Sequence, residues 1–457
     1  MRKLLIANRG EIAVRIARTA REQRIATVAV HSEADAGAEH VRAADEAVLV
    51  GPAPAAASYL NVDALVRAVR SSRADAVHPG YGFLSENAGF AQAVLDSGAT
   101  WVGPSPAAIR EMGDKAAARI SARGAGVPTV PGSDARVRGA GEAERVAVRI
   151  GFPLAIKAAA GGGGRGIRVV EHPRDLAAAV ATAQAEARAA FGSGSVYLER
   201  FIPRARHIEV QVFGDDERVV HLGLRECSMQ RRRQKVIEEA GAIGLPDDAV
   251  AGMCQAAVRL AESVKYTGAG TVEFLYDDRG GEFYFIEMNT RIQVEHPVTE
   301  LVYGLDLVAE QLSVAAGGSL SFAPSDLVPR GHAIEVRINA EDPRLAFLPS
   351  PGMIERFDLP GGPFVRVDSG FTAGSAVSPY YDSLLAKVIV WGPDRPTALA
   401  RMARALRELT ITGVTTTASF ARAVLATPEF QAGDYHTTWL EAWMRDRKAS
   451  GVGACDG

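Results

Sequence analysis

The chain has 457 residues, of which 47% are hydrophobic and 23% are charged. This length exceeds what one hydrophobic core usually supports, so about three domains are expected, and the composition is that of a folded protein rather than a disordered one. With 51 basic and 54 acidic residues, the formal charge of −3 indicates neither a nucleic-acid surface nor a membrane-binding surface. No apolar stretch resembles a membrane span or a signal peptide, so a cytoplasmic location is expected.

The N-terminal part predicts alternating strands and helices. We expect strands at 3–8, 25–31, 47–50 and 74–78, and helices at 11–22, 61–70 and 88–97. This alternation predicts an α/β, Rossmann-like fold. The first turn, around Gly10, has one glycine where a dinucleotide fingerprint needs three, so NAD binding is not predicted.

Two stretches rich in glycine, proline and serine, 124–133 and 317–332, break both periodicities and indicate joints at the two ends of a central region. Beyond the second joint, the pattern predicts an antiparallel region with a helix near its end. Its strands are expected at 333–339, 352–357, 364–368 and 383–391, and its helix at 396–409.

A glycine run, 161–164, follows a short apolar strand that ends near Lys157. Glycines leave backbone N–H groups uncovered, so such a loop can wrap phosphate oxygens. Lys157 is one of only seven lysines among 51 basic residues, and a compact ammonium suits a phosphate oxygen better than a planar guanidinium does. The loop is not a Walker A motif. A phosphate-binding lid is favoured over a flexible hairpin tip.

The strongest chemical signal is an acidic β-hairpin. A register that opposes Tyr276 to Glu282 places Glu273 diagonal to Glu287 on one face, with Asn289 two residues further along. Two carboxylates and an amide oxygen between apolar neighbours repel each other or lose solvation unless a hard cation neutralises them. Mg²⁺ with a nucleotide phosphate fits this donor set, and a solvated strand face is the alternative.

The alternation continues past the hairpin through Arg291, Gln293 and Glu295, with Ile292 and Val294 on the other side. If the chain stays extended, a guanidinium, an amide and a carboxylate line one wall. Such a set binds a small planar oxyanion and supplies a base for its proton.

Three further segments can be interpreted either as ordinary structure or as part of a site. Four cations lie within residues 231–235, including the scarce Lys235, and such a run marks either a solvated face or a site. Residues 199–202 end a β-like run that could face a purine ring. His207 begins an alternating strand, where a lone histidine is more often structural than functional.

In this order, the motifs resemble those of biotin carboxylases, the biotin-carboxylating component of acetyl-CoA carboxylase and its relatives in the ATP-grasp superfamily. The resemblance extends from residue 6 to about residue 445 and includes segments 78–87, 112–115, 337–342 and 379–382. It implies a Rossmann-like N-terminal domain at 1–113 and an ATP-grasp domain at 114–317 with a glycine-rich lid subdomain at about 130–203. An α+β C-terminal domain at 331–445 and a tail at 446–457 complete the expected organisation.

The resemblance also implies roles for individual residues. Contacts to ATP fall to Lys115, Lys157, Gly163, Gly164, Glu199, Arg200, Phe201, Ile202, His207, Gln230 and Arg233, together with Glu273 and Glu287. The metal ligands are Glu273, Glu287 and Asn289. Bicarbonate is bound by Lys235, Arg291, Gln293 and the N–H of Val294, with Glu295 as general base. Biotin is contacted by Arg337, with Tyr81 nearby.

The implied activity is carboxylation of biotin with ATP and bicarbonate, through carboxyphosphate, with Mg²⁺ or Mn²⁺. No Ala-Met-Lys-Met biotinylation site is present, so biotin is expected on a separate carrier protein or domain. A carboxyltransferase component and a homodimer are further expectations. The final acceptor stays open between acetyl-CoA, propionyl-CoA, another acyl-CoA and pyruvate. Another ATP-grasp ligase and a nucleotide-binding subunit without turnover are the alternatives.

Three positions depart from the family pattern. Arg233 stands where histidine is common, Ala160 where the glycine run usually starts, and Gly241 where proline usually follows Glu-Glu-Ala. The first leaves the ribose contact open, and the second implies a slightly stiffer lid.

Overall fold

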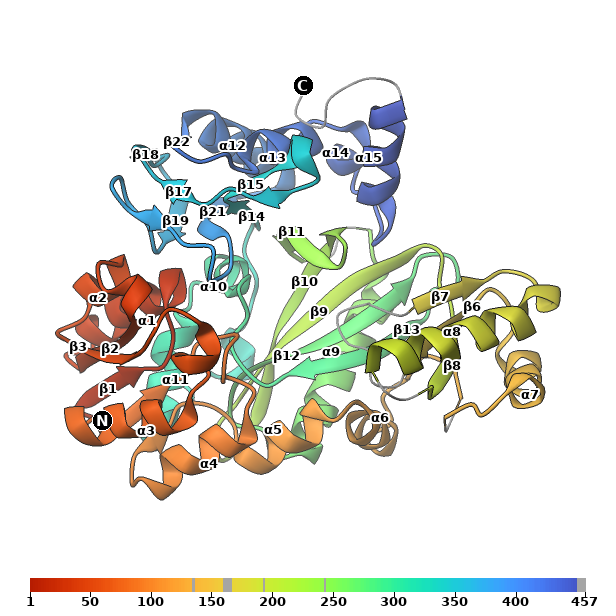
Figure 1. Cartoon of the computed structure of the whole chain (residues 1–457), viewed down its shortest axis with the longest axis horizontal. Helices are drawn as coiled ribbons and strands as arrows, with labels where there is room; N and C mark the ends of the chain where they lie inside the picture. Colours follow the sequence, from red (N-terminus) through yellow and green to blue (C-terminus); the bar gives the residue numbers. More distant parts are fainter. Residues whose placement is uncertain (134–135, 159–166, 192–193, 242–243, 450–457) are drawn as a thin grey trace.

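The computed structural model describes residues 1–133, 136–158, 167–191, 194–241 and 244–449. The N-terminal part lies beside a central sheet, a smaller subdomain extends to the far side, and the C-terminal part lies above (Figure 1). Within the described ranges, no helix combines the length and the apolar character needed to cross a membrane.

The N-terminal part is a parallel five-stranded sheet in the order β3-β2-β1-β4-β5. Leu4, Leu5 and Ile6 of β1 are all buried, as expected for a strand covered on both faces. The strands are β1 Lys3–Ile6, β2 Ala26–Ser32, β3 Glu46–Gly51, β4 Ala76–His78 and β5 Thr100–Trp101. The helices are α1 Gly10–Glu22, α2 Glu39–Ala43, α3 Val62–Ser72, α4 Ala88–Asp96 and α5 Pro106–Gly113. The predicted βα alternation is confirmed.

An antiparallel eight-stranded sheet forms the centre, in the order β13-β12-β9-β10-β11-β14-β21-β19. Its strands are β9 Ala205–Gly214, β10 Val219–Arg231, β11 Gln234–Ala240, β12 Gly268–Asp277, β13 Phe283–Asn289, β14 His332–Asn339, β19 Val365–Ser369 and β21 Leu384–Gly392. Because β11 pairs with β14, the sheet continues across the joint at 317–332. The central and C-terminal parts therefore share one hydrogen-bonded framework.

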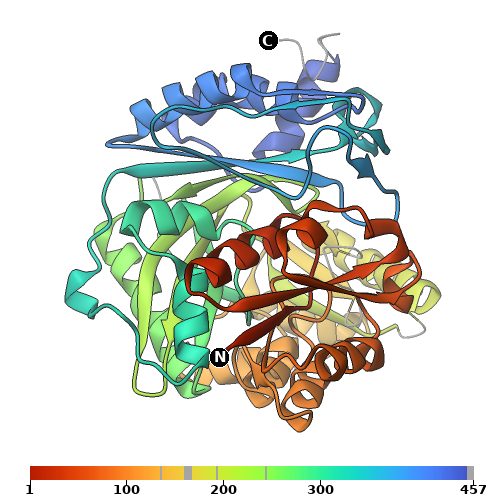
Figure 2. The same cartoon turned by 90° about the vertical axis from the view of Figure 1, so that its left-hand side faces the viewer.

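Helices cover this sheet on its two sides. They are α9 Asp247–Ser263, α10 His296–Tyr303, α11 Leu307–Ala315, α12 Arg395–Glu408, α13 Ala418–Leu425, α14 Pro428–Ala432 and α15 Trp439–Ala449. The blue C-terminal helices form a layer over the strands in Figure 2. The C-terminal part also holds short strands: β15 Glu341–Asp342, β16 Leu348–Pro349, β17 Gly352–Met353, β18 Arg356–Asp358, β20 Ala376–Val377 and β22 Thr410–Thr412. The strand predicted at 352–357 is thus divided into two.

The smaller subdomain has its own three-stranded sheet in the order β7-β6-β8. It consists of α7 Ala140–Ile150, β6 Leu154–Ala158, β7 Ile167–Val170, α8 Leu176–Phe191 and β8 Val196–Arg200, and α6 Lys115–Gly124 precedes it. Its buried core draws only on residues between 137 and 198. Ala160, Gly163 and Gly164 lie outside the described residues, so the predicted lid tip stays a prediction.

The register of the acidic hairpin differs from the prediction. Tyr276 pairs with Phe283 rather than with Glu282, and a register shift at Ile286 then places Glu273 directly opposite Glu287. One extra residue in β13 restores the two carboxylates to a common face, which is what a β-bulge does. The predicted diagonal arrangement is wrong, and the carboxylates are closer neighbours than expected.

The chain after the hairpin also departs from the prediction. It does not stay extended as far as Glu295, because Val294 and Glu295 form a turn that starts α10. This turn brings the Glu295 carboxylate back towards the central strands.

Candidate active site

The acidic hairpin supplies a set of oxygen donors at the edge of the central sheet. Glu273 lies opposite Glu287, and the Asn289 side-chain amide donates a hydrogen bond to Glu273 Oε1 at 2.7 Å. Lys115, the first residue of α6, places its Nζ 3.9 Å from Glu287 Oε2. Burial and the neighbouring Glu273 raise the pKa of the Glu287 carboxyl. This donor set fits a hard divalent cation with phosphate, because the cation would relieve the repulsion between the Glu273 and Glu287 carboxylates.

Strand β9 backs this edge with a histidine and another carboxylate. His207 Nε2 lies 2.9 Å from Glu273 Oε2 and 3.3 Å from Glu209 Oε1. Its other ring nitrogen, Nδ1, is 2.6 Å from Gln230 Nε2. Burial lowers the pKa of His207, but the two carboxylates outweigh it and raise that pKa to about 10. The two carboxylates therefore favour a proton on His207 Nε2, the ring nitrogen that faces them.

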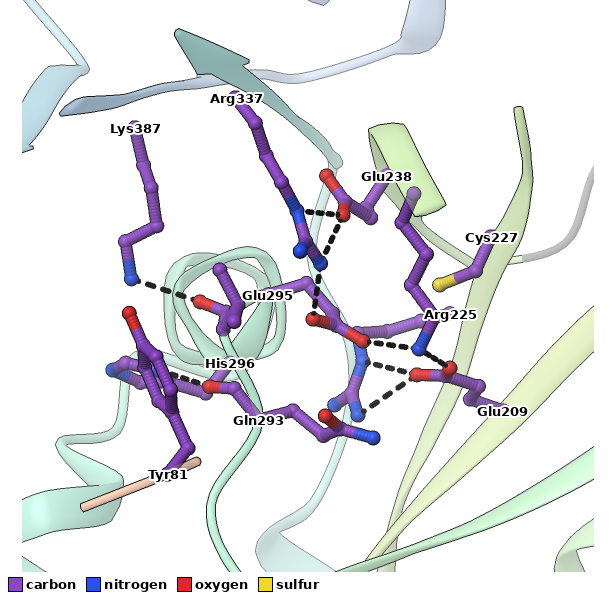
Figure 3. Close-up of polar contacts among 12 residues, drawn as sticks. Tyr81, Glu209, Arg225, Cys227, Glu238, Gln293, Glu295, His296, Arg337 and Lys387 are labelled. Atoms are coloured by element: carbon purple, nitrogen blue, oxygen red, sulfur yellow. Dashed lines mark hydrogen bonds and ion pairs between the residues drawn. The ribbon is translucent and has the colours of Figure 1, made fainter. Parts of the chain in front are cut away.

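Glu295 lies between two cations at the start of α10. Its Oε1 is 2.7 Å from Lys235 Nζ, and its Oε2 accepts a hydrogen bond from Arg337 Nη2 at 2.8 Å (Figure 3). Lys235 Nζ also contacts Glu209 and lies 3.3 Å from Glu273 Oε1. Burial raises the pKa of the Glu295 carboxyl, but Lys235 and Arg337 lower it by more than burial raises it, so the pKa falls below its usual value. Glu295 is thus a fully buried carboxylate that stays ionised at neutral pH.

Arg291 connects the metal-type donors to Gln293. Its Nη2 donates to Asn289 Oδ1 at 2.9 Å and its Nη1 to Gln293 Oε1 at 2.7 Å. Its Nε donates to Glu86 Oε2 at 3.0 Å. The Gln293 amide in turn donates to Glu273 Oε1 at 3.2 Å. The structure therefore brings the predicted oxyanion-binding residues together, although through a turn rather than along a strand.

The peptide of Val294 is fixed by a lysine from a distant strand. Lys387 Nζ, on β21, donates to the Val294 carbonyl at 2.8 Å and lies 3.0 Å from Glu11 Oε1. The Tyr81 hydroxyl donates to the same Glu11 carboxylate. Burial and Glu11 raise the pKa of Tyr81, so its hydroxyl stays protonated. Tyr81 and Arg337 thus frame the side of the site predicted to face biotin (Figure 3).

The smaller subdomain contributes a second charged cluster. Lys157 on β6 and Arg119 on α6 both form ion pairs with Glu199 on β8. Burial raises the pKa of the Glu199 carboxyl, but Lys157 and Arg119 lower it, with a net decrease. Lys157 is therefore paired with a carboxylate, while 40% of its side chain remains exposed to solvent.

The remaining residues predicted to contact the nucleotide lie around β8 and the β10–β11 turn. Arg200 Nη1 is 3.8 Å from Glu282, the Phe201 N–H donates to a backbone carbonyl at 2.9 Å, and Ile202 packs in a small buried cluster. Arg232 and Arg233 have φ values of 48° and 66°, which two-residue hairpin turns of the primed type require. The N–H of Arg232 donates to Glu441 of α15 at 2.9 Å.

Several residues of the site were missed from the sequence. Arg225 is fully buried and contacts Glu209, Gln211, Thr271 and Thr299. Glu209 and Glu238 lie in strands whose alternation resembles that of an ordinary sheet. Lys387 carried a usable signal, because it is one of seven lysines and lies in the middle of an apolar strand.

Three family models match the chain in order. They describe the biotin carboxylase N-terminal domain at 1–109, the ATP-binding domain of the carbamoyl-phosphate synthase L chain at 114–323, and the biotin carboxylase C-terminal domain at 335–442. Together they cover most of the described residues.

Curated relatives agree over nearly the whole chain. A biotin carboxylase from Nostoc is 53% identical over 96% of this chain and 98% of its own length. One from Bacillus subtilis is 50% identical over 97% and 99%, and a chloroplastic one from Arabidopsis thaliana is 52% identical over 96% and 82%.

Solved structures match equally well. A biotin carboxylase from Campylobacter jejuni, described as a β,γ-ATP complex, has a TM-score of 0.91 with 45% identity, covering 96% of this chain and 98% of that one. The biotin carboxylase domain dimer of Hydrogenobacter thermophilus 2-oxoglutarate carboxylase, described with MgADP, ADP and bicarbonate, has a TM-score of 0.89 with 45% identity over 96% and 97%. The predicted α/β, ATP-grasp fold is confirmed, and the chain belongs to the biotin carboxylase family of ATP-dependent carboxylating ligases.

Proposed function

We propose that this chain carboxylates biotin with ATP and bicarbonate through the residues assembled around Glu295, as the first half-reaction of an acetyl-CoA or other acyl-CoA carboxylase. The observation that supports this best is the buried Glu295 carboxylate held between Lys235 and Arg337. It combines a base with two cations beside a metal-type donor set, which a nucleotide-binding subunit without turnover does not need.

Glu295 takes the proton of bicarbonate. Lys235, Arg291 and Gln293 bind the oxyanion and orient one oxygen towards the γ-phosphorus of ATP. The O–P bond that forms yields carboxyphosphate, and the bond to the β-phosphate oxygen breaks to release ADP. Exclusion of water matters at this stage, because carboxyphosphate hydrolyses readily.

The phosphates are proposed to contact lysines from two parts of the chain. Lys115 extends from the start of α6 and Lys157 from β6, so both ammonium groups can meet phosphate oxygens as point charges. Glu273, Glu287 and Asn289 would hold Mg²⁺ or Mn²⁺, which neutralises charge on the phosphates when it is bound. Adenine and ribose contacts are proposed for residues 199–202, His207, Gln230 and Arg233.

Biotin receives the carboxyl group in the second step. Carboxyphosphate breaks to CO₂ and phosphate, and phosphate takes the proton from the biotin ureido nitrogen. The Arg337 guanidinium stabilises the negative charge that develops on the ureido oxygen. As the ureido nitrogen attacks CO₂, this charge passes to the new carboxylate group and the ureido carbonyl re-forms. Tyr81 lines the same side.

The partners of the chain are also proposed from its relatives. Stand-alone relatives of matching length support a separate biotin carrier and a separate carboxyltransferase component. A homodimer is supported by the dimer described for the Hydrogenobacter domain. Propionyl-CoA and pyruvate are the alternatives to acetyl-CoA as acceptor, and pyruvate is supported by one solved neighbour, the biotin carboxylase subunit of a pyruvate carboxylase. The cytoplasmic location expected from the sequence stays a prediction.

The test is ADP release measured with and without bicarbonate, and with and without free biotin. We expect release that requires bicarbonate and rises with biotin, because biotin consumes the carboxyphosphate products. Turnover that ignored bicarbonate would contradict the proposal. Turnover that required an amine instead of biotin would favour another ATP-grasp ligase.

A further inference from the structure

Two buried carboxyl groups beside Arg337 have no part in the steps above. Glu238 on β11 and Glu335 on β14 are directly paired across the two strands, so their side chains share one face of the sheet. Both residues are fully buried. Arg337 lies two residues after Glu335 on the same face, diagonal to Glu238.

The two carboxyls differ sharply in their contacts. Glu238 Oε1 accepts a hydrogen bond from Arg337 Nε at 2.6 Å and lies 2.5 Å from Arg337 Nη2. Glu238 Oε2 and both oxygens of Glu335 have no hydrogen-bond partner among the described residues. A fully ionised carboxylate without any donor is costly in a buried position, whereas a neutral carboxyl costs much less.

The surrounding charges also favour a neutral carboxyl at one of the two residues. The charged and titratable groups that act on Glu335 come from β11, β14, β21, the loop after β4 and the start of α10. They are the carboxyls of Glu238 and Glu295, the cations Arg337 and Lys387, and the Tyr81 hydroxyl. Lys387 and Tyr81 both contact a further carboxylate, Glu11. The carboxyls of Glu335, Glu238, Glu295 and Glu11 therefore surround two cations, Arg337 and Lys387. Lys387 also lies 3.8 Å from Asp368, which is itself paired with Arg366. Lys235 on Glu295 adds a third cation, but it is shared with Glu209 and Glu273. Full ionisation would leave excess negative charge in a buried place.

We propose that Glu238 and Glu335 are positioning residues that share one proton, with the proton on Glu335 and the charge on Glu238, and so hold the Arg337 guanidinium in place for biotin. This role rests on the proposed carboxylation of biotin. Burial raises the pKa of Glu335 well above its usual value, and Glu238 raises it further, against the influence of Lys387. Burial also raises the pKa of Glu238, but Arg337 opposes this and the pKa rises only to about 7, so Glu238 is the member that ionises first.

The arrangement has a geometric consequence for Arg337. Its Nε and Nη2 are occupied by Glu238 and Glu295, which fixes the plane of the guanidinium. A second charge at Glu335 would draw Arg337 or Lys387 away from these positions. The neutral Glu335 therefore leaves Arg337 oriented by Glu238 and Glu295 alone.

Infrared spectroscopy of the substrate-free protein tests the proton directly. At a pH well above the pKa of about 7 of Glu238, where that carboxyl is ionised, we expect the carbonyl stretch of one buried protonated carboxyl, which Glu335→Gln removes. Glu239→Gln is the matched control, because Glu239 is the next residue on β11 and is equally buried. Its carboxylate is paired with Arg395, His332 and Tyr435, so that variant keeps the signal. If Glu335→Gln does not fold, Glu335→Met serves instead. Absence of the signal from the wild-type protein, or its survival in the Glu335 variant, would overturn the proposal.

Kinetics test the positioning role. We expect Glu335→Gln to lower kcat/KM for biotin much less than Glu238→Gln does, because an amide resembles the neutral carboxyl. Glu238→Gln removes the negative charge that holds the Arg337 guanidinium and lowers kcat/KM for biotin by about 10-fold or more, while bicarbonate-dependent ATP cleavage without biotin continues. Equal losses in both variants would contradict a shared proton. If the wild type failed to use biotin, the proposed function would be wrong. The infrared result would still show whether Glu335 carries the proton, because that measurement needs no turnover.

Discussion

Glu295 shows how one side chain is prepared for proton transfer. A buried carboxylate usually gains a proton because burial destabilises its charge. Here Lys235 and Arg337, at 2.7 and 2.8 Å, reverse that effect and keep Glu295 ionised. The same cations limit its basicity, so the carboxylate depends on close contact with bicarbonate rather than on a raised pKa.

Replacement of Glu295 by glutamine separates the base from the binding site. Glu295→Gln keeps the size and one acceptor oxygen but cannot take the bicarbonate proton. We expect MgATP binding to survive and turnover to fall by about 10²–10⁴-fold, the usual contribution of general-base catalysis. Steady-state ADP release and nucleotide binding by calorimetry measure the two effects. Near-normal turnover would remove Glu295 from the proton transfer.

At the scale of single elements, helix α6 positions Lys115 through its cap. Asp114 accepts hydrogen bonds from the N–H groups of Ala116 and Ala117 at 2.8 and 2.9 Å. Asp114→Ala should destabilise the protein by about 1 kcal/mol and raise KM for ATP, because the turn that carries Lys115 loses its cap. Asp114→Asn retains a capping oxygen and is the control. Thermal unfolding and ATP titration measure both, and an equal change in the two variants would assign the effect to charge rather than to the cap.

Strand β11 has a second carboxylate whose role is structural. Glu239 is buried among Arg395, His332 and Tyr435, and it links the central sheet to the C-terminal helices. Burial raises the pKa of Glu239, but hydrogen bonds from His332 and Arg395 lower it from 4.5 to about 2. A lowered pKa stabilises the fold above the unfolded value of 4.5, and this stabilisation is lost as pH falls towards 2.

Glu239→Gln should therefore lose stability in a pH-dependent way. At neutral pH we expect the free energy of unfolding to fall by about 3 kcal/mol, the equivalent of the lowered pKa. The difference from the wild type should shrink as the pH approaches about 2, because the wild-type carboxyl then takes up a proton as well. Urea unfolding at several pH values measures this. A difference that stayed constant with pH would show that Glu239 acts through packing alone.

The same elements show what local sequence patterns can and cannot reveal. The βα alternation was predictable because buried parallel strands are continuous apolar runs between amphipathic helices. The hairpin register was not, because the bulge at Ile286 leaves no mark in the period of two. Glu209 and Glu335 were overlooked because a charged residue in an alternating strand resembles a solvated face. Only the pairing of distant strands reveals that these faces are buried.

At the scale of the whole molecule, two kinds of connection coexist. The central and C-terminal parts share one sheet through the β11–β14 pair, so the predicted joint at 317–332 does not separate two independent frameworks. The smaller subdomain, in contrast, has a closed core of its own. Its contacts with the rest include the Glu199–Arg119 and Arg200–Glu282 ion pairs and the bridge between Gly132 and Glu199. It is the part best placed to move as a unit.

Hydrogen exchange tests this difference. Without nucleotide, we expect the amides of β6 and α8 to exchange faster than those of β9 and β12, because the small core opens at lower free energy than the central sheet. MgATP should slow exchange in β6 and β8, since a phosphate that binds Lys157 draws the subdomain towards Lys115. Lys157→Ala should keep the difference between the two parts and lose the slowing by nucleotide. Equal exchange rates in both parts, or slowing that survives in Lys157→Ala, would show that the subdomain does not close on phosphate through this lysine.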